Sequence, residues 1–185
     1  KFWLINVLDA KKPQQKLFSM NFFNKFPFLK QKNTYLFVLI VTIVFFLDRI
    51  TKIKIINHQI NNSRLYINDF TNFDLVWNTG IGFGILSSNS NLIYNSISAV
   101  IGLVLIFLVY LIVKSKFIDR IFFSLLLGGA LGNFYDRIEY SAVPDFIDIH
   151  YKNIHWFTFN IADIFITLSV IMLIIKDLFS RNDKN

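Results

Sequence analysis

The chain has 185 residues, of which 54% are hydrophobic and 22 are Phe, and it carries a formal net charge of +7. A soluble domain of this length would have too little polar surface to cover so many apolar side chains, so we expect a single integral membrane domain. The chain contains no Cys, which excludes disulfides, zinc–thiolate sites and cysteine nucleophiles.

Residues 1–33 are predicted to form a basic cytoplasmic or interfacial arm. This segment is rich in Lys, has the single acidic residue Asp9, and contains Pro13 and Pro27, which interrupt any long helix. Basic and aromatic side chains together suit an anionic lipid surface. The arm therefore explains part of the positive charge without a nucleic-acid partner.

The first predicted span covers residues 34–50, where 35–47 is apolar apart from Thr42. Charged residues follow it in place of a small-residue cleavage site, so we expect an uncleaved anchor. Asp48, Thr51 and Lys52 share one helical face. Two interpretations of Asp48 and Lys52 stay open: an ion pair at a helix end, or support for a functional site.

Residues 53–91 are predicted to form a polar loop with strand-like runs, notably 73–77. Gly80, Gly82 and Gly84 alternate after Asn78 in this loop. A phosphate-binding loop is poorly supported, because the helical context and the Lys-Ser/Thr ending are absent. A tight loop at the mouth of a site is the preferred interpretation. The second span, 92–113, has no charged residue and is long enough to cross about 30 Å of hydrocarbon.

The third span is predicted at 121–135. Gly128 and Gly132 have GxxxG spacing, which lets helices approach closely. A second polar loop follows at 136–159, then a fourth span at 161–175 and a charged tail at 176–185. One side of the third span continues into the polar residues Asn133, Asp136 and Arg137.

Most Lys and Arg residues fall in the arm, in the turn at 114–120 and in the tail. The positive-inside rule then places both termini in the cytoplasm. The predicted fold is an all-α integral membrane domain at 34–175, with four transmembrane helices and a small strand-containing external region. The polar residues that this topology gathers at the external face are Asp48, Asn78, Asp136, Asp145 and Asp163.

Asp145 and Asp163 are the acidic residues most in need of an explanation. A charged side chain in a membrane-spanning helix costs about 2.5–3.5 kcal/mol, and Asp163 lies in the first turn of the fourth span. If the segment around Asp145 is extended, Asp145 shares a face with Val143 and Ile147, whereas Asp148 lies on the other face. This alternation favours Asp145 over Asp148 as the buried carboxylate.

Two neighbouring carboxylates can share one proton. The ionised one then takes a proton from an attacking water, and the protonated one hydrogen-bonds the substrate carbonyl. Such a pair hydrolyses peptides without metal or cofactor. The alternatives left open are acids that merely pair with Arg137, Lys52 or backbone groups, a small proton- or ion-coupled transporter, and a structural membrane subunit.

The three histidines, His58, His150 and His155, give no metal-binding pattern. His150 and His155 lack helical spacing and an obvious third ligand, so interfacial or solvated side chains are expected and no metal site is predicted.

Five motifs together resemble the bacterial lipoprotein signal peptidase (signal peptidase II) family. They are Asp48-Arg-Ile-Thr-Lys52, Asn78-Thr-Gly80, the run from Gly128 to Arg137, Val143-Pro-Asp-Phe146 and Phe159-Asn-Ile-Ala-Asp163. They occur in the family's order over roughly residues 34–175. The bulky Ile81 followed by Gly82 departs from the family's usual small residues.

The resemblance implies an aspartyl endopeptidase of the bacterial cytoplasmic (inner) membrane, with its site toward the external side. Its substrates would be prolipoproteins cleaved before a diacylglyceryl-modified cysteine, and globomycin-type inhibitors and membrane lipids would bind it. No cofactor is implied. Asp145 and Asp163 would be catalytic, and the residues lining or supporting the site would be Asp48, Lys52, Asn78, Gly80, Asn133, Asp136, Arg137 and Asn160.

Overall fold

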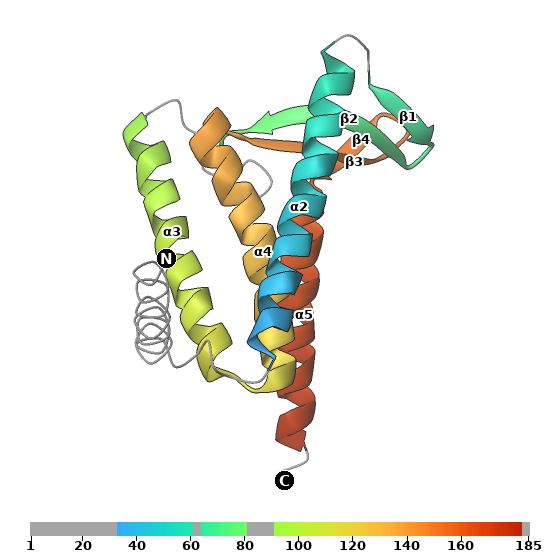
Figure 1. Ribbon diagram of the computed structural model, residues 1–185. Helices are drawn as coiled ribbons and strands as arrows, with labels where there is room; N and C mark the ends of the chain where they lie inside the picture. Colours follow the sequence, from blue (N-terminus) through green and yellow to red (C-terminus); the bar gives the residue numbers. More distant parts are fainter. Residues whose placement is uncertain (1–32, 61–63, 81–90, 183–185) are drawn as a thin grey trace, which may run out of the picture. The chain divides into compact units, whose positions relative to one another are not determined.

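The computed structural model describes residues 33–60, 64–80 and 91–182. The chain divides into two units, Lys1–Leu36 and Phe37–Asn185, and the architecture that follows is that of the second. Four long helices and one four-stranded antiparallel sheet make up its described part (Figure 1). The helices are α2 (Thr34–Gln59), α3 (Asn91–Lys114), α4 (Phe117–Tyr140) and α5 (Ile161–Asn182).

The sheet is built from both predicted polar loops. Its order is β1 (Leu65–Asn68), β2 (Thr71–Asn78), β3 (Val143–Tyr151) and β4 (Ile154–Phe159). These segments are rich in aromatic and β-branched residues, which favour a pleated, half-buried surface. Pairing of β2 with β3 joins the two loops and sets Val76 opposite Asp145. The fold is therefore mostly helical with a small antiparallel sheet, and the predicted strand-containing region forms that sheet.

Three helices extend well beyond their predicted C-terminal ends. α2 continues to Gln59 instead of ending near residue 50, so Asp48 and Lys52 lie inside the helix. α4 continues to Tyr140, and α5 extends to Asn182 into the predicted tail. Residues 1–32 of the predicted arm, and Ile81 to Gly84 of the glycine loop, lie outside the described residues.

Glycines on α4 let two neighbouring helices approach closely. A Cβ on Gly128 would lie 2.7 Å from Cβ of Val44 on α2, and a Cβ on Gly129 would lie 2.7 Å from the carbonyl oxygen of Ala162 on α5. Gly132 faces the carboxylate of Asp48 in the same way. The packing role predicted for Gly128 and Gly132 is confirmed, and this packing brings α2 and α5 together against α4.

We expect Gly128→Ala to destabilise the protein by about 1–3 kcal/mol, because the added methyl overpacks the contact with α2. Gly102→Ala on α3 is the matched control. Its Cβ would meet the Phe134 ring at an ordinary 3.6 Å, so the gain in helix propensity remains and stability is held or raised. Thermal unfolding in detergent measures both. Equal effects of the two substitutions would contradict this packing.

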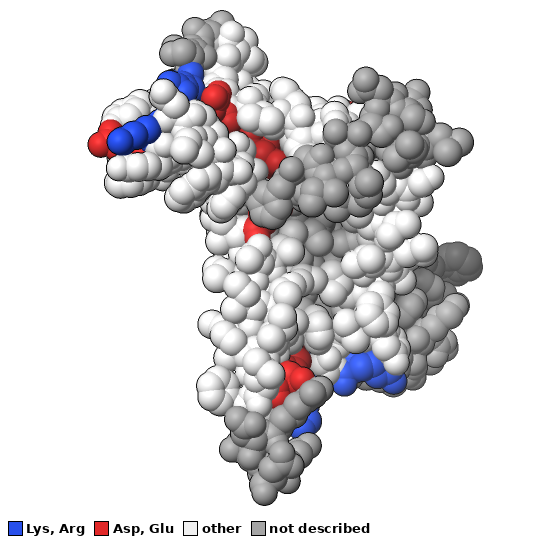
Figure 2. Space-filling model, turned by 180° about the vertical axis from the view of Figure 1, so that it is seen from behind, with Lys and Arg blue, Asp and Glu red and all other residues white. Residues whose placement is uncertain are grey.

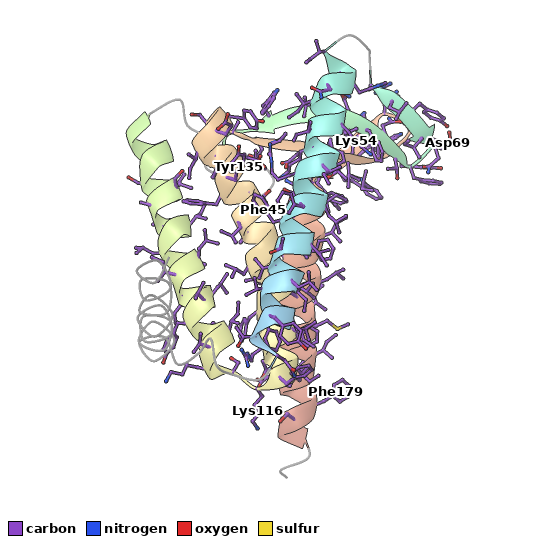
Figure 3. All side chains as sticks on the ribbon, in the orientation of Figure 1. Phe45, Lys54, Asp69, Lys116, Tyr135 and Phe179 are labelled. Carbon is purple, nitrogen blue, oxygen red and sulfur yellow. The ribbon has the colours of Figure 1, made fainter. Side chains whose placement is uncertain are left out.

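Two helical segments, Ser96–Lys114 and Phe117–Tyr140, are long and apolar enough to cross a membrane, in a search confined to the described residues. Large apolar side chains are also exposed on α2 and α5, among them Val38, Phe46 and Ile171. On the face drawn in Figure 2, charged side chains gather at the sheet end and at the opposite end, with uncharged surface between. Figure 3 likewise places Asp69 at the sheet end and Lys116 at the other.

Candidate active site

Asp145 lies on β3 at the junction of the sheet and the helices, with only 4% of its surface exposed. Both of its carboxylate oxygens accept hydrogen bonds from amide side chains. Asn78 Nδ2, at the end of β2, donates to Oδ2 at 2.9 Å, and Asn160 Nδ2 donates to Oδ1 at 2.6 Å. Neutral donors thus orient the carboxylate on both sides.

Asp163 lies in the first turn of α5 and closes a reciprocal cap with Asn160. Asn160 Oδ1 accepts from the Asp163 amide at 3.0 Å, and Asp163 Oδ2 accepts from the Asn160 amide at 3.1 Å. This is the arrangement of a capping box, which satisfies amides at a helix start. Asn133 Nδ2 on α4 donates to the other oxygen, Oδ1, at 2.8 Å. Asn160 therefore contacts both acids and fixes their relative position.

A buried ion cluster lies between α2 and α4 and is linked to Asp163 through Asn133. Lys52 Nζ, fully buried, donates to Asp48 Oδ2 at 2.7 Å, Asp136 Oδ2 at 2.6 Å and Asn133 Oδ1 at 2.8 Å. Asp48 Oδ1 in turn accepts from the Ala162 amide at the start of α5, at 2.9 Å. The Asp48–Lys52 pair is thus buried and reaches the acids through Asn133 and α5.

Arg137 on α4 holds the backbone that directly follows Asn78. Its Nη2 donates to the carbonyl oxygen of Gly80 at 2.9 Å, and its Nη1 donates to that of Asn133 at 3.1 Å. The Gly80 amide donates to Asn78 Oδ1 at 2.9 Å, which leaves Asn78 Nδ2 directed at Asp145. Arg137 therefore orients Asn78 through the backbone.

Burial raises the pKa of Asp145 to about 6, and the negative charge of Asp163 adds to this effect. Hydrogen bonds from Asn78 and Asn160, and the charge of Lys52, oppose the rise. A carboxyl group with a pKa near 6 keeps its proton at pH values at which an ordinary carboxyl group has lost it. The pair therefore holds a proton under mildly acidic conditions.

Burial does not separate Asp145 from Asp148, which is only 3% exposed. The two acids differ in their partners. Asp145 Oδ1 and Oδ2 accept hydrogen bonds from Asn160 and Asn78, whereas Asp148 Oδ2 contacts His155 and His150. The expectation that Asp145 rather than Asp148 is the buried carboxylate is therefore wrong, because both acids are buried. The two acids nevertheless contact different partners, as the alternation along the strand predicts.

The structure joins all ten sequence-predicted site residues in one hydrogen-bonded network. Thr51, predicted on the face of Asp48 and Lys52, instead donates to the backbone oxygens of Leu47 and Asp48. Sequence reasoning missed Arg49, which pairs with Asp136 and lies over the Tyr135 ring at 4.6 Å. A second cation beside Asp48 in an apolar helix was the signal that could have indicated this partner.

Comparisons with known proteins agree with this geometry. The sequence model described as Signal peptidase (SPase) II matches residues 40–179. The chain belongs to the signal peptidase II family. A lipoprotein signal peptidase of Pelagibacter ubique (strain HTCC1062) is 50% identical over 83% of this chain and 93% of its own. One from Anaplasma phagocytophilum (strain HZ) is 35% identical over 80% and 95%.

A solved bacterial membrane enzyme has the same fold, with a TM-score of 0.68 and 33% identity over 82% of this chain and 93% of its own. Family membership makes the chain a membrane protease of lipoprotein processing. It favours this function over the transporter and the structural subunit, because neither alternative belongs to the signal peptidase II family.

Proposed function

We propose that the chain is a multi-pass aspartyl endopeptidase of the bacterial inner membrane. It removes signal peptides from diacylglyceryl-modified prolipoproteins by cleaving before the lipidated cysteine. The observation that carries the proposal is the pair of acids linked through Asn160, which donates to Asp145 and closes a reciprocal cap with Asp163. Membership of the signal peptidase II family supplies the substrate class.

In the proposed reaction, one carboxylate of the Asp145–Asp163 pair accepts a proton from water, and the water oxygen attacks the carbonyl carbon of the scissile peptide. The protonated partner donates a hydrogen bond to the carbonyl oxygen. Collapse of the tetrahedral intermediate breaks the C–N bond, and the departing cysteine amine takes a proton from the pair. Asn78, Asn133 and Asn160 orient the acids without adding charge, so the pair can retain its shared proton.

We further propose that all four helices span the bilayer, with the sheet at the external face. Exposed apolar side chains on α2 and α5 support this, because faces of this kind suit lipid. The acids then lie near the membrane boundary. There the acyl chains of a lipid-modified substrate remain in the bilayer while its peptide reaches water.

A depletion experiment in cells tests the substrate class. Cells in which this chain is the only signal peptidase II should accumulate uncleaved, lipid-modified prolipoprotein when it is depleted, and globomycin should produce the same precursor. Immunoblotting with palmitate labelling identifies the species. Normal maturation after depletion would rule the proposal out, and accumulation of a precursor that lacks lipid would place the chain at another step.

The pH dependence of cleavage follows from the pKa of Asp145, which is raised to about 6. Above that pH, the free enzyme loses the shared proton, so kcat/KM should fall as pH rises through about 6. A bound substrate excludes water and raises the pKa further, so the decline in kcat should occur at higher pH. Initial rates with a lipid-modified peptide measure both profiles.

Asn78→Ala is the diagnostic variant for this profile. Asn78 stabilises the ionised form of Asp145, so its removal raises the Asp145 pKa and should move the decline in kcat/KM to higher pH. A decline that stays in place or moves to lower pH in Asn78→Ala would refute the assignment of this ionisation to Asp145.

A further inference from the structure

A second cluster of ionisable side chains lies on the sheet, outside the network of Asp145 and Asp163. Asp148 and His150 on β3 and His155 on β4 offer ligand atoms that all lie within 4.8 Å of one another. Asp148 Oδ2 is 2.8 Å from His155 Nδ1 and 3.5 Å from His150 Nδ1. No contact described for the peptidase site involves these three side chains. We propose that they form a binding site for a divalent transition-metal ion of the Zn²⁺ class.

The arrangement of acceptor atoms points to a cation. When a neutral imidazole carries its proton on Nε2, its Nδ1 is an acceptor. In this tautomer the Nδ1 atoms of His150 and His155 and the carboxylate oxygen of Asp148 form a group of three acceptors. In that tautomer the ring protons point away from the cluster, and a divalent ion satisfies all three acceptors at once. Two imidazoles and a carboxylate are a ligand set that suits Zn²⁺ and related ions, in contrast to the all-oxygen sets of Mg²⁺ and Ca²⁺.

The distances from Asp148 to the two histidines are close to those of a loaded site. With metal–ligand bonds of about 2.0–2.1 Å, tetrahedral ligand atoms lie roughly 3.3–3.4 Å apart. The 3.5 Å between Asp148 Oδ2 and His150 Nδ1 fits, and the 2.8 Å contact with His155 lengthens slightly when a metal replaces the shared proton. The imidazole rings stack with centroids 5.3 Å apart, so loading requires the half-exposed ring of His155 to turn toward His150.

Asn72 on β2 supplies a second observation. It is 3% exposed, pairs with Asp148 across the strands, and its Oδ1 has no hydrogen-bond partner among the described residues. Its amide lies against His150, with Nδ2 3.4 Å from Nε2. The same Nδ2 is 3.5 Å from Nδ1, so a half-turn of the amide would set the acceptor Oδ1 beside the ring nitrogens, where it can accept the Nε2–H of His150 when Nδ1 binds the metal. That bond fixes the tautomer in which Nδ1 is a free ligand, the usual support for a metal-bound histidine.

The local backbone also favours a site. The pairing of β3 with β4 shifts register between Ile149 and His150, so His150 lies opposite His155 and Trp156 is bulged out. Bulges re-aim side chains within a sheet. Asp148 and His150 are buried, and the His155 side chain is exposed enough for an ion to enter. A bound ion would tie β4 to the strand that carries Asp145.

Zinc titration of the full chain, purified without a polyhistidine tag, tests the proposal. The chain has no Cys and three His, so few competing soft ligands exist. Wild type should bind one equivalent of Zn²⁺ and unfold at higher temperature in its presence. His155→Gln should weaken Zn²⁺ binding at least about tenfold and lose the thermal shift, while unfolding as wild type does without metal.

The matched control is His58→Gln, which removes the remaining histidine, on α2, and should leave Zn²⁺ affinity unchanged. Asp148→Asn should weaken Zn²⁺ binding as His155→Gln does, and Mg²⁺ should not bind. The proposal is overturned if wild type binds no Zn²⁺, if His155→Gln binds as tightly as wild type, if His58→Gln loses as much affinity as His155→Gln, or if Mg²⁺ binds equally well.

Discussion

Asp163→Asn and Asp145→Asn should each lower the rate of prolipoprotein cleavage by on the order of 10²–10⁴-fold, the usual contribution of general acid–base catalysis. An amide keeps the shape of the side chain but can neither accept the proton of the attacking water nor share a proton with its partner. Because the two acids act as one unit, the double variant should be about as slow as the slower single variant. Initial rates on a lipid-modified peptide measure all three.

Asp148→Asn is the matched control for this experiment. It makes the same chemical change in a buried carboxyl on the same strand, but Asp148 contacts His150 and His155 and belongs to no contact of the Asp145–Asp163 network. It should cleave at close to the wild-type rate. Near-normal cleavage by either Asp145→Asn or Asp163→Asn would refute the dyad, and a loss in Asp148→Asn equal to theirs would show that the assay reports damage to the sheet.

Lys52→Met should destabilise the protein by about 3–5 kcal/mol, the usual cost of removing one partner from a buried ion pair. The ammonium group is fully buried and donates to Asp48, Asp136 and Asn133. Its loss leaves the buried carboxylates of Asp48 and Asp136, of which Asp136 keeps an ion pair with Arg49, and no other ion pair to either acid is seen among the described residues. Thermal unfolding in detergent should show the loss. Cleavage should also slow in the surviving folded protein, because Asn133 no longer has a fixed position from which to orient Asp163.

Lys54→Met on the same helix provides the comparison. Lys54 is exposed at the sheet end of α2, as Figure 3 shows, so its substitution should change stability by less than about 0.5 kcal/mol. If Lys52→Met were as stable as Lys54→Met, the buried cluster would not hold the helices together. If it were unstable but cleaved normally once folded, Lys52 would support the fold without positioning Asp163.

Much of the helical part could be predicted because long apolar runs identify helices directly. The extensions of α2 to Gln59 and α4 to Tyr140 could not, because there the helices continue into polar sequence, where packing rather than hydropathy decides their length. The sheet was underestimated for a related reason. Pairing of β2 with β3 joins segments far apart in the chain, and no local pattern encodes such a register.

In the candidate site, spacing and motifs predicted which residues take part but not all of their contacts. Alternation along the strand distinguished the environment of Asp145 from that of Asp148, but it could not predict that both are buried. Helical spacing paired Asp48 with Lys52, yet the contacts of Lys52 with Asn133 and Asp136 depend on how α2 meets α4. The close approach of α2 to α4 depends on Gly128, whose packing role was predicted. The neighbourhood of His150, His155 and Asp148 depends on the pairing of β3 with β4, which the sequence pattern does not encode.

The most direct test of the account is the position and lipid dependence of the cut made by the purified chain. Mass spectrometry should show a diacylglyceryl-modified prolipoprotein peptide cleaved immediately before its modified cysteine, with the same peptide lacking lipid left intact and globomycin blocking the reaction. Cleavage at another bond, equal cleavage of the unmodified peptide, or a lipid-modified peptide left uncut by the active wild-type preparation would contradict it.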